Sequence, residues 1–287
     1  MTEATAKLDK LKDILREMGG LVLGYSGGVD SSFLLSVAAE VLGSRAVAAT
    51  ARSEVYPSAE YEASLALVRE LGVEHVVFET SELAIDSFAD NPPDRCYFCK
   101  KELFSKLRAI ADERGIPWIA HAAQADDLGD HRPGLRAGQE LEARAPLIEA
   151  GLTKADIREL SRERNLPTWD KPAMACLASR FPYGSRITPE KLTQVGEAEC
   201  ALRELGFRQY RARHHGDMVR LEIGAEDMPR LVSEPLRSDL IAKMKSLGFT
   251  YVTLDLQGFR SGSMNETLTA AQKATGAAQT ATPGSEQ

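Results

Sequence analysis

The sequence predicts an α/β protein with two domains: one built on a parallel sheet, then a small α+β domain of order α-β-β-α-β. Short apolar runs alternate with helix-length amphipathic segments from residue 21 to about residue 170, as in a parallel sheet covered on both faces. A glycine-rich turn joins the first apolar run to a buried helix. At Ile187–Pro189 the pattern changes to a helix and a hairpin. We therefore expect domains at residues 1–186 and 187–265, followed by a disordered tail at 266–287.

The elements of the first domain follow in order along the chain. An amphipathic helix occupies the first twenty residues. The expected strands are 21–23, 46–50, 75–78 and 118–120, and the helices between them are 33–42, 58–71 and 100–114. Thr153–Asp156 has the spacing of a capping box and opens a further helix. Ligands of such a sheet bind at the carboxyl ends of its strands.

The second domain begins with a helix that Thr188 caps and Pro189 opens, and that Gly206 ends. Strands 210–214 and 218–223 follow, joined by a Gly-Asp turn suited to a hairpin. In this register apolar side chains share one face. The other face carries Arg211, Arg213, Arg220 and Glu222, with Arg211 opposite Glu222. A helical region at 226–247 and a strand at 251–256 complete the domain.

Composition indicates a globular protein, with 43% hydrophobic and 27% charged residues among 287. A net charge of −7 gives no overall attraction to nucleic acid. The charged first twenty residues are unlike a signal peptide, and no apolar run reaches membrane-spanning length. We therefore expect a cytoplasmic protein that binds neither nucleic acid nor membrane, with its four cysteines reduced or bound to metal.

The loop Gly24–Ser32 joins the first strand to the buried helix. Gly27 and Gly28 let the backbone approach an anion, toward which the N–H groups of the helix start point. Ser26, Ser31 and Ser32 can donate hydroxyl hydrogen bonds to the anion. Asp30 has a carboxylate suited to Mg²⁺. The alternative is a tight turn with a serine helix cap. The loop matches neither the Walker loop nor Gly-x-Gly-x-x-Gly.

The run Ser-Gly-Gly-x-Asp-Ser resembles the pyrophosphate loop (PP-loop) of the ATP pyrophosphatases. This resemblance implies an adenine nucleotide alpha hydrolase-like domain that binds ATP, adenylates an oxygen of its substrate and releases pyrophosphate. Asp126 and Asp127 follow the fourth strand at its carboxyl end. They form either a solvated turn or contacts to ribose or metal, and their position favours a role near the nucleotide.

Cys96 and Cys99 form a Cys-x-x-Cys pair, and Cys176 lies 77 residues later in a long loop. The pair is compatible with a redox couple, with two small buried residues, or with a metal or iron–sulfur site. A fourth cysteine, Cys200, falls in an amphipathic helix, where we expect core packing. Three cysteines with an open metal position are the more specific hypothesis.

Together, the segments Ser26–Ser31, Asp126–Gly134 and Cys176–Gly184 make residues 1 to about 265 resemble the LarE family. The resemblance implies an ATP-dependent sulfur transferase. Its substrate is pyridinium-3,5-biscarboxylic acid mononucleotide, whose carboxylates are adenylated and converted to thiocarboxylates for the nickel-pincer cofactor of lactate racemase. It also implies a homo-oligomer and a downstream nickel-insertion protein.

By the same resemblance, Cys176 is the sulfur-bearing cysteine. In one branch of the family this cysteine gives up its own sulfur and becomes dehydroalanine. Cys96 and Cys99 make this sequence similar instead to the branch in which three cysteines hold a [4Fe-4S] cluster that carries a hydrosulfide.

The family pattern further implies that Arg211 and Arg213 hold the substrate phosphate, beside Glu199 and Glu222. Ser179 and Arg180 are expected to line the reaction pocket with Cys176, and Arg180 is expected to be catalytic. For the arginines, the alternative is a solvated basic strand face.

Two other functions compete with sulfur transfer to the pyridinium substrate. One is a tRNA-thiolating PP-loop adenylase. The other is a non-catalytic ATP- or nickel-binding protein with His214, His215 and Glu222 as ligands. Adjacent histidines on a strand point to opposite faces and make a poor chelate.

Overall fold

The computed structural model describes residues 2–56, 58–129, 132–172, 175–260, 262–270 and 272. The chain divides into two compact units, the first made of Met1–Glu82, Asp94–Met174 and Thr269–Gln287 and the second of Leu83–Pro93 and Ala175–Leu268. Cys176 therefore belongs to the second unit, as does the short earlier segment Leu83–Pro93. Most of the predicted tail lies outside the described residues. At its start, a 3-10 helix at Ser263–Thr267 leads to a buried Leu268.

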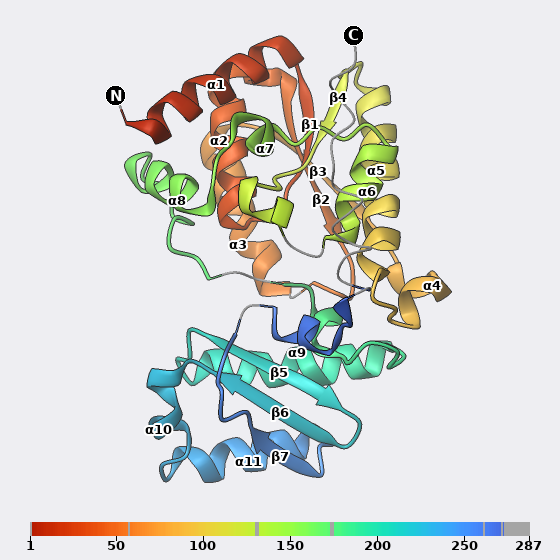
Figure 1. Cartoon of the computed structure of the whole chain (residues 1–287), viewed down its shortest axis with the longest axis vertical. Coiled ribbons are helices and arrows are strands. Elements are labelled where there is room, and N and C mark those ends of the chain that lie inside the picture. The colour runs from red at the N-terminus through yellow and green to blue at the C-terminus, as the bar shows by residue number, and fades with distance from the viewer. Residues whose placement is uncertain are drawn as a thin grey trace. The chain divides into compact units, whose positions relative to one another are not determined.

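The first unit contains a parallel sheet of order β3-β2-β1-β4 (Figure 1). Its strands are β1 (Leu21–Gly24), β2 (Ala46–Arg52), β3 (Glu74–Glu79) and β4 (Trp118–Ala120). The predicted parallel sheet is confirmed, because each predicted strand lies within or overlaps an observed one. The chain steps from β1 through β2 to β3 on one side, then returns to place β4 on the other side of β1. This reversal makes the carboxyl ends of β1 and β4 a topological switch point.

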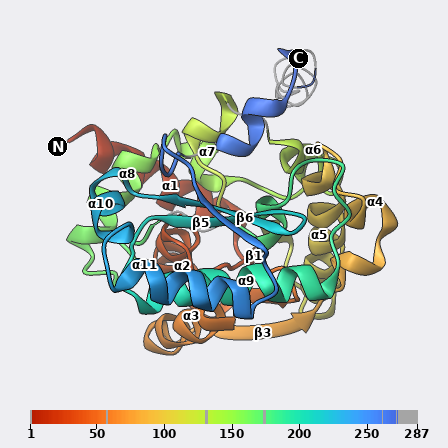
Figure 2. The same cartoon turned by 90° about the horizontal axis from the view of Figure 1, so that it is seen from below.

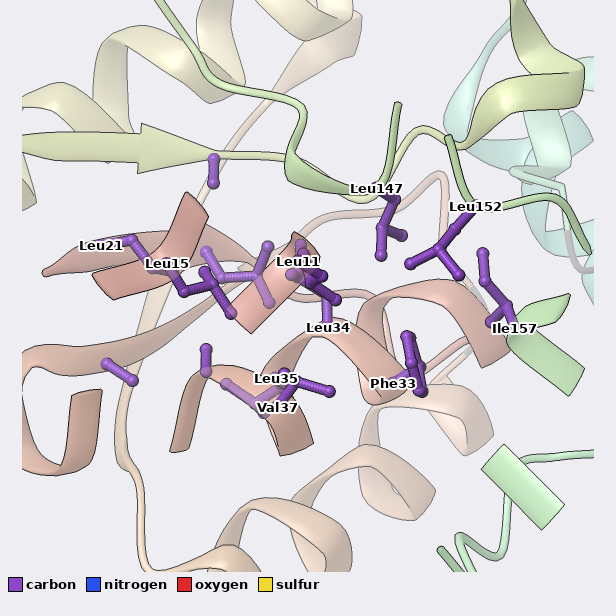
Figure 3. Packing of buried hydrophobic residues seen from close by; sticks show 14 of the residues in the cluster. Leu11, Leu15, Leu21, Phe33, Leu34, Leu35, Val37, Leu147, Leu152 and Ile157 are labelled. Carbon is purple, nitrogen blue, oxygen red and sulfur yellow. The ribbon is translucent and has the colours of Figure 1, made fainter. Parts of the chain in front are cut away.

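Helices cover both faces of this sheet. The helices of this unit are α1 (Glu3–Met18), α2 (Val29–Leu42), α3 (Ser58–Leu71), α5 (Arg95–Glu113), α6 (Pro133–Glu140), α7 (Pro146–Ala150) and α8 (Lys154–Glu163). Side chains of α1 and α2 pack with those of Leu147, Leu152 and Ile157 in one core cluster (Figure 3). Val22 points the opposite way from Leu21 and packs with residues of α5 and α6, as the alternation of a strand requires. The helix α2 is apolar nearly all round because other elements surround it.

The second unit has a sheet of order β5-β6-β7. Its elements are α4 (Asp86–Ala89), α9 (Pro189–Glu204), β5 (Tyr210–His215), β6 (Met218–Ile223), α10 (Met228–Leu231), α11 (Leu236–Ser246) and β7 (Tyr251–Leu254). The strands β5 and β6 are antiparallel, and the predicted register holds, with Arg211 opposite Glu222. The helices α9 and α11 lie side by side (Figure 2) and bury the apolar face of the hairpin. The helical region predicted at 226–247 is interrupted near Pro235, which removes a backbone donor.

Within the part of the chain that the structure describes, no helix is both long and apolar enough to cross a membrane.

Candidate active site

The PP-loop lies at the switch point, between the end of β1 and the start of α2. Gly27 has φ +68°, a left-handed conformation that favours glycine. The hydroxyls of Ser26 and Ser31 lie 3.1 Å apart, and the Ser31 hydroxyl donates to the carbonyl of Gly28 at 3.3 Å. Gly28 precedes α2 and has no side chain with which to cap it. The N-terminal N–H groups of α2 are thus available to an anion.

Asp30 and Asp126, both predicted to contact ATP or its metal, are linked through one lysine. The ammonium of Lys154 lies 2.7 Å from each carboxylate oxygen of Asp30. The backbone N–H of Lys154 donates to Asp126 Oδ2 at 2.9 Å. Lys171 also reaches the loop, where its ammonium donates to the Gly27 carbonyl at 3.0 Å. Sequence reasoning missed both lysines, because nothing in their local pattern points to a loop more than a hundred residues earlier.

His121, directly after β4, is held as a neutral imidazole. Its Nδ1 accepts the N–H of Ala123 at 3.3 Å, and its ring centroid lies 5.4 Å from that of Phe104. Burial, and then the charge of Lys100, lower the His121 pKa to about 4. Below pH ~6.5 the unfolded chain therefore binds a proton at His121, whereas the imidazole of the folded chain stays unprotonated until the pH falls to about 4.

We expect His121 to make stability depend on acid pH. Its contribution to the free energy of unfolding is complete above pH ~6.5 and is lost as the pH falls toward ~4, where the folded state finally takes up the proton. At about 1.4 kcal/mol per pKa unit, discounted for residual exposure, the loss is roughly 2–3 kcal/mol. Urea unfolding of wild type and His121→Gln across this range measures it. A wild-type curve parallel to that of the variant would contradict the expectation.

Cys96 and Cys99 lie in the first turn of α5, not before that helix as the sequence pattern indicated. Their spacing of three places them on the same side of the helix. Cys96 is exposed and Cys99 buried. The Cys99 sulfur lies 3.8 Å from Glu82 Oε1, which also accepts the hydroxyl of Thr80 at 3.0 Å. Glu82 is buried. Its contact with Cys99 could not be predicted from the sequence, because the two residues are 17 apart and lie in different elements.

Two thiols on one turn at a helix N-terminus fit two ligand positions of an iron–sulfur cluster, since the helix dipole favours thiolate. The third predicted ligand, Cys176, belongs to the second unit. Among residues whose placement is described, no three His, Cys, Asp or Glu side chains group as a metal site. The three-cysteine cluster stays a prediction.

Cys176 begins a 3-10 turn at Leu177–Arg180 that a buried arginine holds. The Arg180 guanidinium donates to both oxygens of Glu199, at 2.7 and 2.8 Å. Its Nη1 donates to the carbonyls of Ala175 and Cys176 and to the Ser179 hydroxyl, at 3.1, 3.2 and 2.7 Å. Arg180 therefore fixes the backbone carbonyls of Ala175 and Cys176, directly before and after the cysteine side chain. Its other donors bind Ser179 and Glu199.

Arg213 ties the same turn to the hairpin. It donates to both oxygens of Glu222 at 3.0 and 2.8 Å, and to the Ser179 carbonyl and the Ser263 hydroxyl, both at 2.7 Å. Glu222 is fully buried. This face of the hairpin is thus covered, and the alternative of a solvated basic strand face is wrong.

Arg211 lies in the same buried group but is held differently. Its Nη1 donates to the Tyr210 carbonyl at 2.7 Å, and its guanidinium carbon lies 4.9 Å from the centre of the Phe259 ring. Burial, and then repulsion by the Arg180 charge, lower the Arg211 pKa to about 10. With Arg220, which donates to Glu222 at 3.2 Å and lies 3.7 Å from Asp255, four arginines thus face three carboxylates: Arg180, Arg211, Arg213 and Arg220 against Glu199, Glu222 and Asp255. The surplus positive charge favours a bound anion.

Two further predictions concern residues of this unit. His214 lies on the core side, where its Nε2 contacts Gln194 Oε1 at 3.0 Å and its ring packs on Phe181 and Phe249. This arrangement gives no support to a nickel site with His215 and Glu222. The predicted core role of Cys200 is wrong, because its sulfur contacts Glu204 and Arg203 on the outer side of α9, at 3.3 and 3.2 Å.

Comparison with known proteins agrees with this architecture. The NAD synthase family model matches residues 4–117. The chain is 38% identical to the pyridinium-3,5-bisthiocarboxylic acid mononucleotide synthase of Lactiplantibacillus plantarum over 96% of this chain and 99% of that protein. It is 41% identical to protein slr1717 of Synechocystis, over 92% and 98%. The tRNA-specific 2-thiouridylase MnmA of Xanthobacter autotrophicus is 30% identical over 53% of this chain and 49% of that enzyme.

The parallel sheet and the loop at its switch point define an ATP pyrophosphatase of the PP-loop class, an ATP-dependent enzyme. Within that class, the chain belongs to the family of the pyridinium-3,5-bisthiocarboxylic acid mononucleotide synthases, LarE.

Proposed function

We propose that this protein converts the two carboxylates of pyridinium-3,5-biscarboxylic acid mononucleotide to thiocarboxylates at the expense of ATP. The observation that carries the proposal is the full-length similarity to the named synthase, which covers both units. The PP-loop geometry supports the ATP half of the reaction, and the buried arginine group supports binding of a phosphate. A cytoplasmic location, a homo-oligomer and a downstream nickel-insertion protein belong to the same proposal.

The adenylation step takes place at the PP-loop. The N-terminus of α2 and the hydroxyls of Ser26 and Ser31 bind the phosphates, and Asp30 is the carboxylate that suits Mg²⁺. A substrate carboxylate oxygen bonds to the α-phosphorus of ATP as pyrophosphate leaves. A sulfur nucleophile then bonds to the acyl carbon, and AMP departs with the oxygen. A second round treats the other carboxylate.

Cys96, Cys99 and Cys176 would hold a [4Fe-4S] cluster, which when bound would supply a hydrosulfide as the sulfur nucleophile. The role of Arg180 and Arg213 is to fix the turn at Cys176, through the carbonyls of Cys176 and Ser179. Transfer of the Cys176 sulfur itself is the alternative within the same family, and it needs the same fixed turn.

Product analysis tests the proposed function. Protein incubated with ATP, Mg²⁺, the pyridinium mononucleotide and sulfide is expected to form AMP, pyrophosphate and thiocarboxylate, with pyrophosphate release dependent on the pyridinium substrate. Formation of ADP and phosphate would contradict the proposal. A requirement for tRNA, with steep loss of binding on adding salt, would instead favour the tRNA-thiolating alternative.

Arg211→Met is expected to weaken binding of the mononucleotide by about 1.5–3 kcal/mol, the value of a charge-assisted contact, and to leave ATP binding unchanged. Replacing Arg211 leaves both bidentate arginine–glutamate pairs, Arg180–Glu199 and Arg213–Glu222, intact. Replacing Arg213 breaks the second pair. Calorimetric titration with each ligand makes the measurement. Equal losses for both ligands would assign Arg211 a structural role.

Arg213→Met is the contrasting variant. It leaves the fully buried Glu222 without its closest guanidinium partner, so we expect a loss of about 3–5 kcal/mol in the free energy of unfolding.

A further inference from the structure

The Lys154–Asp30 ion pair stands at the point where the PP-loop becomes α2. The ammonium contacts both carboxylate oxygens at 2.7 Å, so the two oxygens that suit Mg²⁺ are engaged by a cation of the protein itself. The side chains are 33% and 25% exposed, which leaves the pair open to an incoming ligand. Lys154 is the first residue of α8, and Asp126 holds its backbone N–H. The lysine side chain can therefore turn while its backbone stays fixed.

The charge of the loop is insufficient for its proposed ligand. The loop has no lysine of the Walker kind, and a helix N-terminus offers only about half an elementary charge against the several negative charges of ATP. Two ammonium groups reach the loop from later in the chain, those of Lys154 and Lys171. Arg158 of α8 donates to the carbonyls of Trp169 and Lys171, both at 2.8 Å. One helix thus sets the position of both cations.

We propose that Lys154 is a phosphate-binding residue that exchanges between Asp30 and the polyphosphate of ATP. The proposal rests on the proposed function of the loop. The Lys154 ammonium occupies the two oxygens of Asp30 that Mg²⁺ would need, so Lys154 leaves them when MgATP binds. The displaced cation lies at the first turn of α2, where the phosphates bind. It supplies the charge that a Walker lysine supplies elsewhere.

A purely structural ion pair on the same helix provides the comparison. Lys7 of α1 lies 2.9 Å from Asp156 of α8, with exposed fractions of 21% and 17%. This pair joins α8 to α1 and does not involve the loop. The capping box of α8 uses Thr153 and Asp156, so the Lys154 side chain is not part of it. Replacing Lys154 therefore leaves the start of the helix intact.

The test compares Lys154→Met, Lys154→Arg and Lys7→Met in the full chain. Binding of Mn²⁺ without nucleotide is followed by electron paramagnetic resonance, and binding of ATP with Mg²⁺ by calorimetry. We expect Lys154→Met to bind Mn²⁺ roughly two- to fivefold more tightly, since a competing ion pair is gone. We expect the same variant to bind MgATP roughly ten- to hundredfold more weakly. Lys154→Arg is expected to restore most of the MgATP affinity, and Lys7→Met to change neither constant.

Unchanged MgATP affinity in Lys154→Met would overturn the inference. A parallel loss of Mn²⁺ and MgATP affinity, together with a lower melting temperature, would overturn it in favour of a structural pair. A wild-type protein that does not bind MgATP would overturn the proposed function itself, and this failure is distinct because it is seen in the unaltered chain.

Discussion

Asp30→Asn is expected to lower pyrophosphate release by about 10²–10³-fold, the size of effect that follows loss of one preorganised electrostatic contact in a transition state. Asparagine keeps the shape of the side chain but lacks the negative charge of the carboxylate, which is the ligand that Mg²⁺ prefers. It also removes the ion pair with Lys154. Asp30 lies in the first turn of α2, where loss of a negative charge costs about 0.3–1 kcal/mol, so the fold should persist. Initial rates of pyrophosphate release at increasing Mg²⁺ provide the measurement.

The matched control for Asp30→Asn is Glu40→Gln, ten residues later on the same helix. Glu40 pairs with Lys12 and Arg164, and these two contacts lower its pKa. Its loss should cost up to about 1 kcal/mol of stability per partly exposed pair and leave the rate unchanged. Full activity of Asp30→Asn at saturating Mg²⁺ would show that the carboxylate is not a metal ligand.

The hairpin register could be predicted from sequence because two local signals agree. The Gly216–Asp217 turn fixes the pairing, and apolar side chains alternate on both strands, so a shift by one residue would expose them. The alternation of apolar and polar side chains could not show that the polar face of the hairpin, which carries Arg213 and Glu222, is buried too. That burial comes from Ser179 and Ser263, whose contacts to Arg213 span 34 and 50 residues.

The predicted start of α5, at residue 100, is too late because the apolar stripe of the helix begins after its first turn. Leu103, Leu107 and Ile110 repeat at helical spacing, whereas the turn that contains Cys96 and Cys99 has no such repeat. The observed helix starts at Arg95, directly after Pro92, Pro93 and Asp94. Proline disrupts a helix interior, so the two prolines mark the limit before which this helix cannot begin, and the apolar stripe does not carry that information.

The PP-loop was recognisable because phosphate binding depends on a short run of backbone and side-chain chemistry. The contact between Asp30 and Lys154 spans 124 residues and depends on how α8 packs against α2. The contact between Arg180 and Glu199 could not be predicted for a similar reason, because the two residues are 19 apart in sequence and meet only in the folded chain. The catalytic role expected of Arg180 stays a prediction.

Cys96→Ala is expected to abolish repeated turnover, because it removes one of three proposed thiolate ligands of a [4Fe-4S] cluster. Wild-type protein reconstituted without oxygen should form several thiocarboxylates per chain when sulfide is supplied, with its mass unchanged. The variant should lose its bound iron and form at most one sulfur product per chain. Iron and sulfide assays, product counts and intact-protein mass spectrometry measure the three quantities.

Cys200→Ala is the matched control for Cys96→Ala. Cys200 contacts Glu204 and Arg203 on the outer side of α9 and is not one of the three proposed cluster ligands, so its loss should change neither iron content nor turnover. The competing sacrificial mechanism has a distinct signature. A cysteine that gives up its sulfur becomes dehydroalanine, and the chain loses the mass of hydrogen sulfide. Wild-type protein that stops at one sulfur per chain, with dehydroalanine at position 176, would overturn the cluster proposal and establish Cys176 as the sulfur donor.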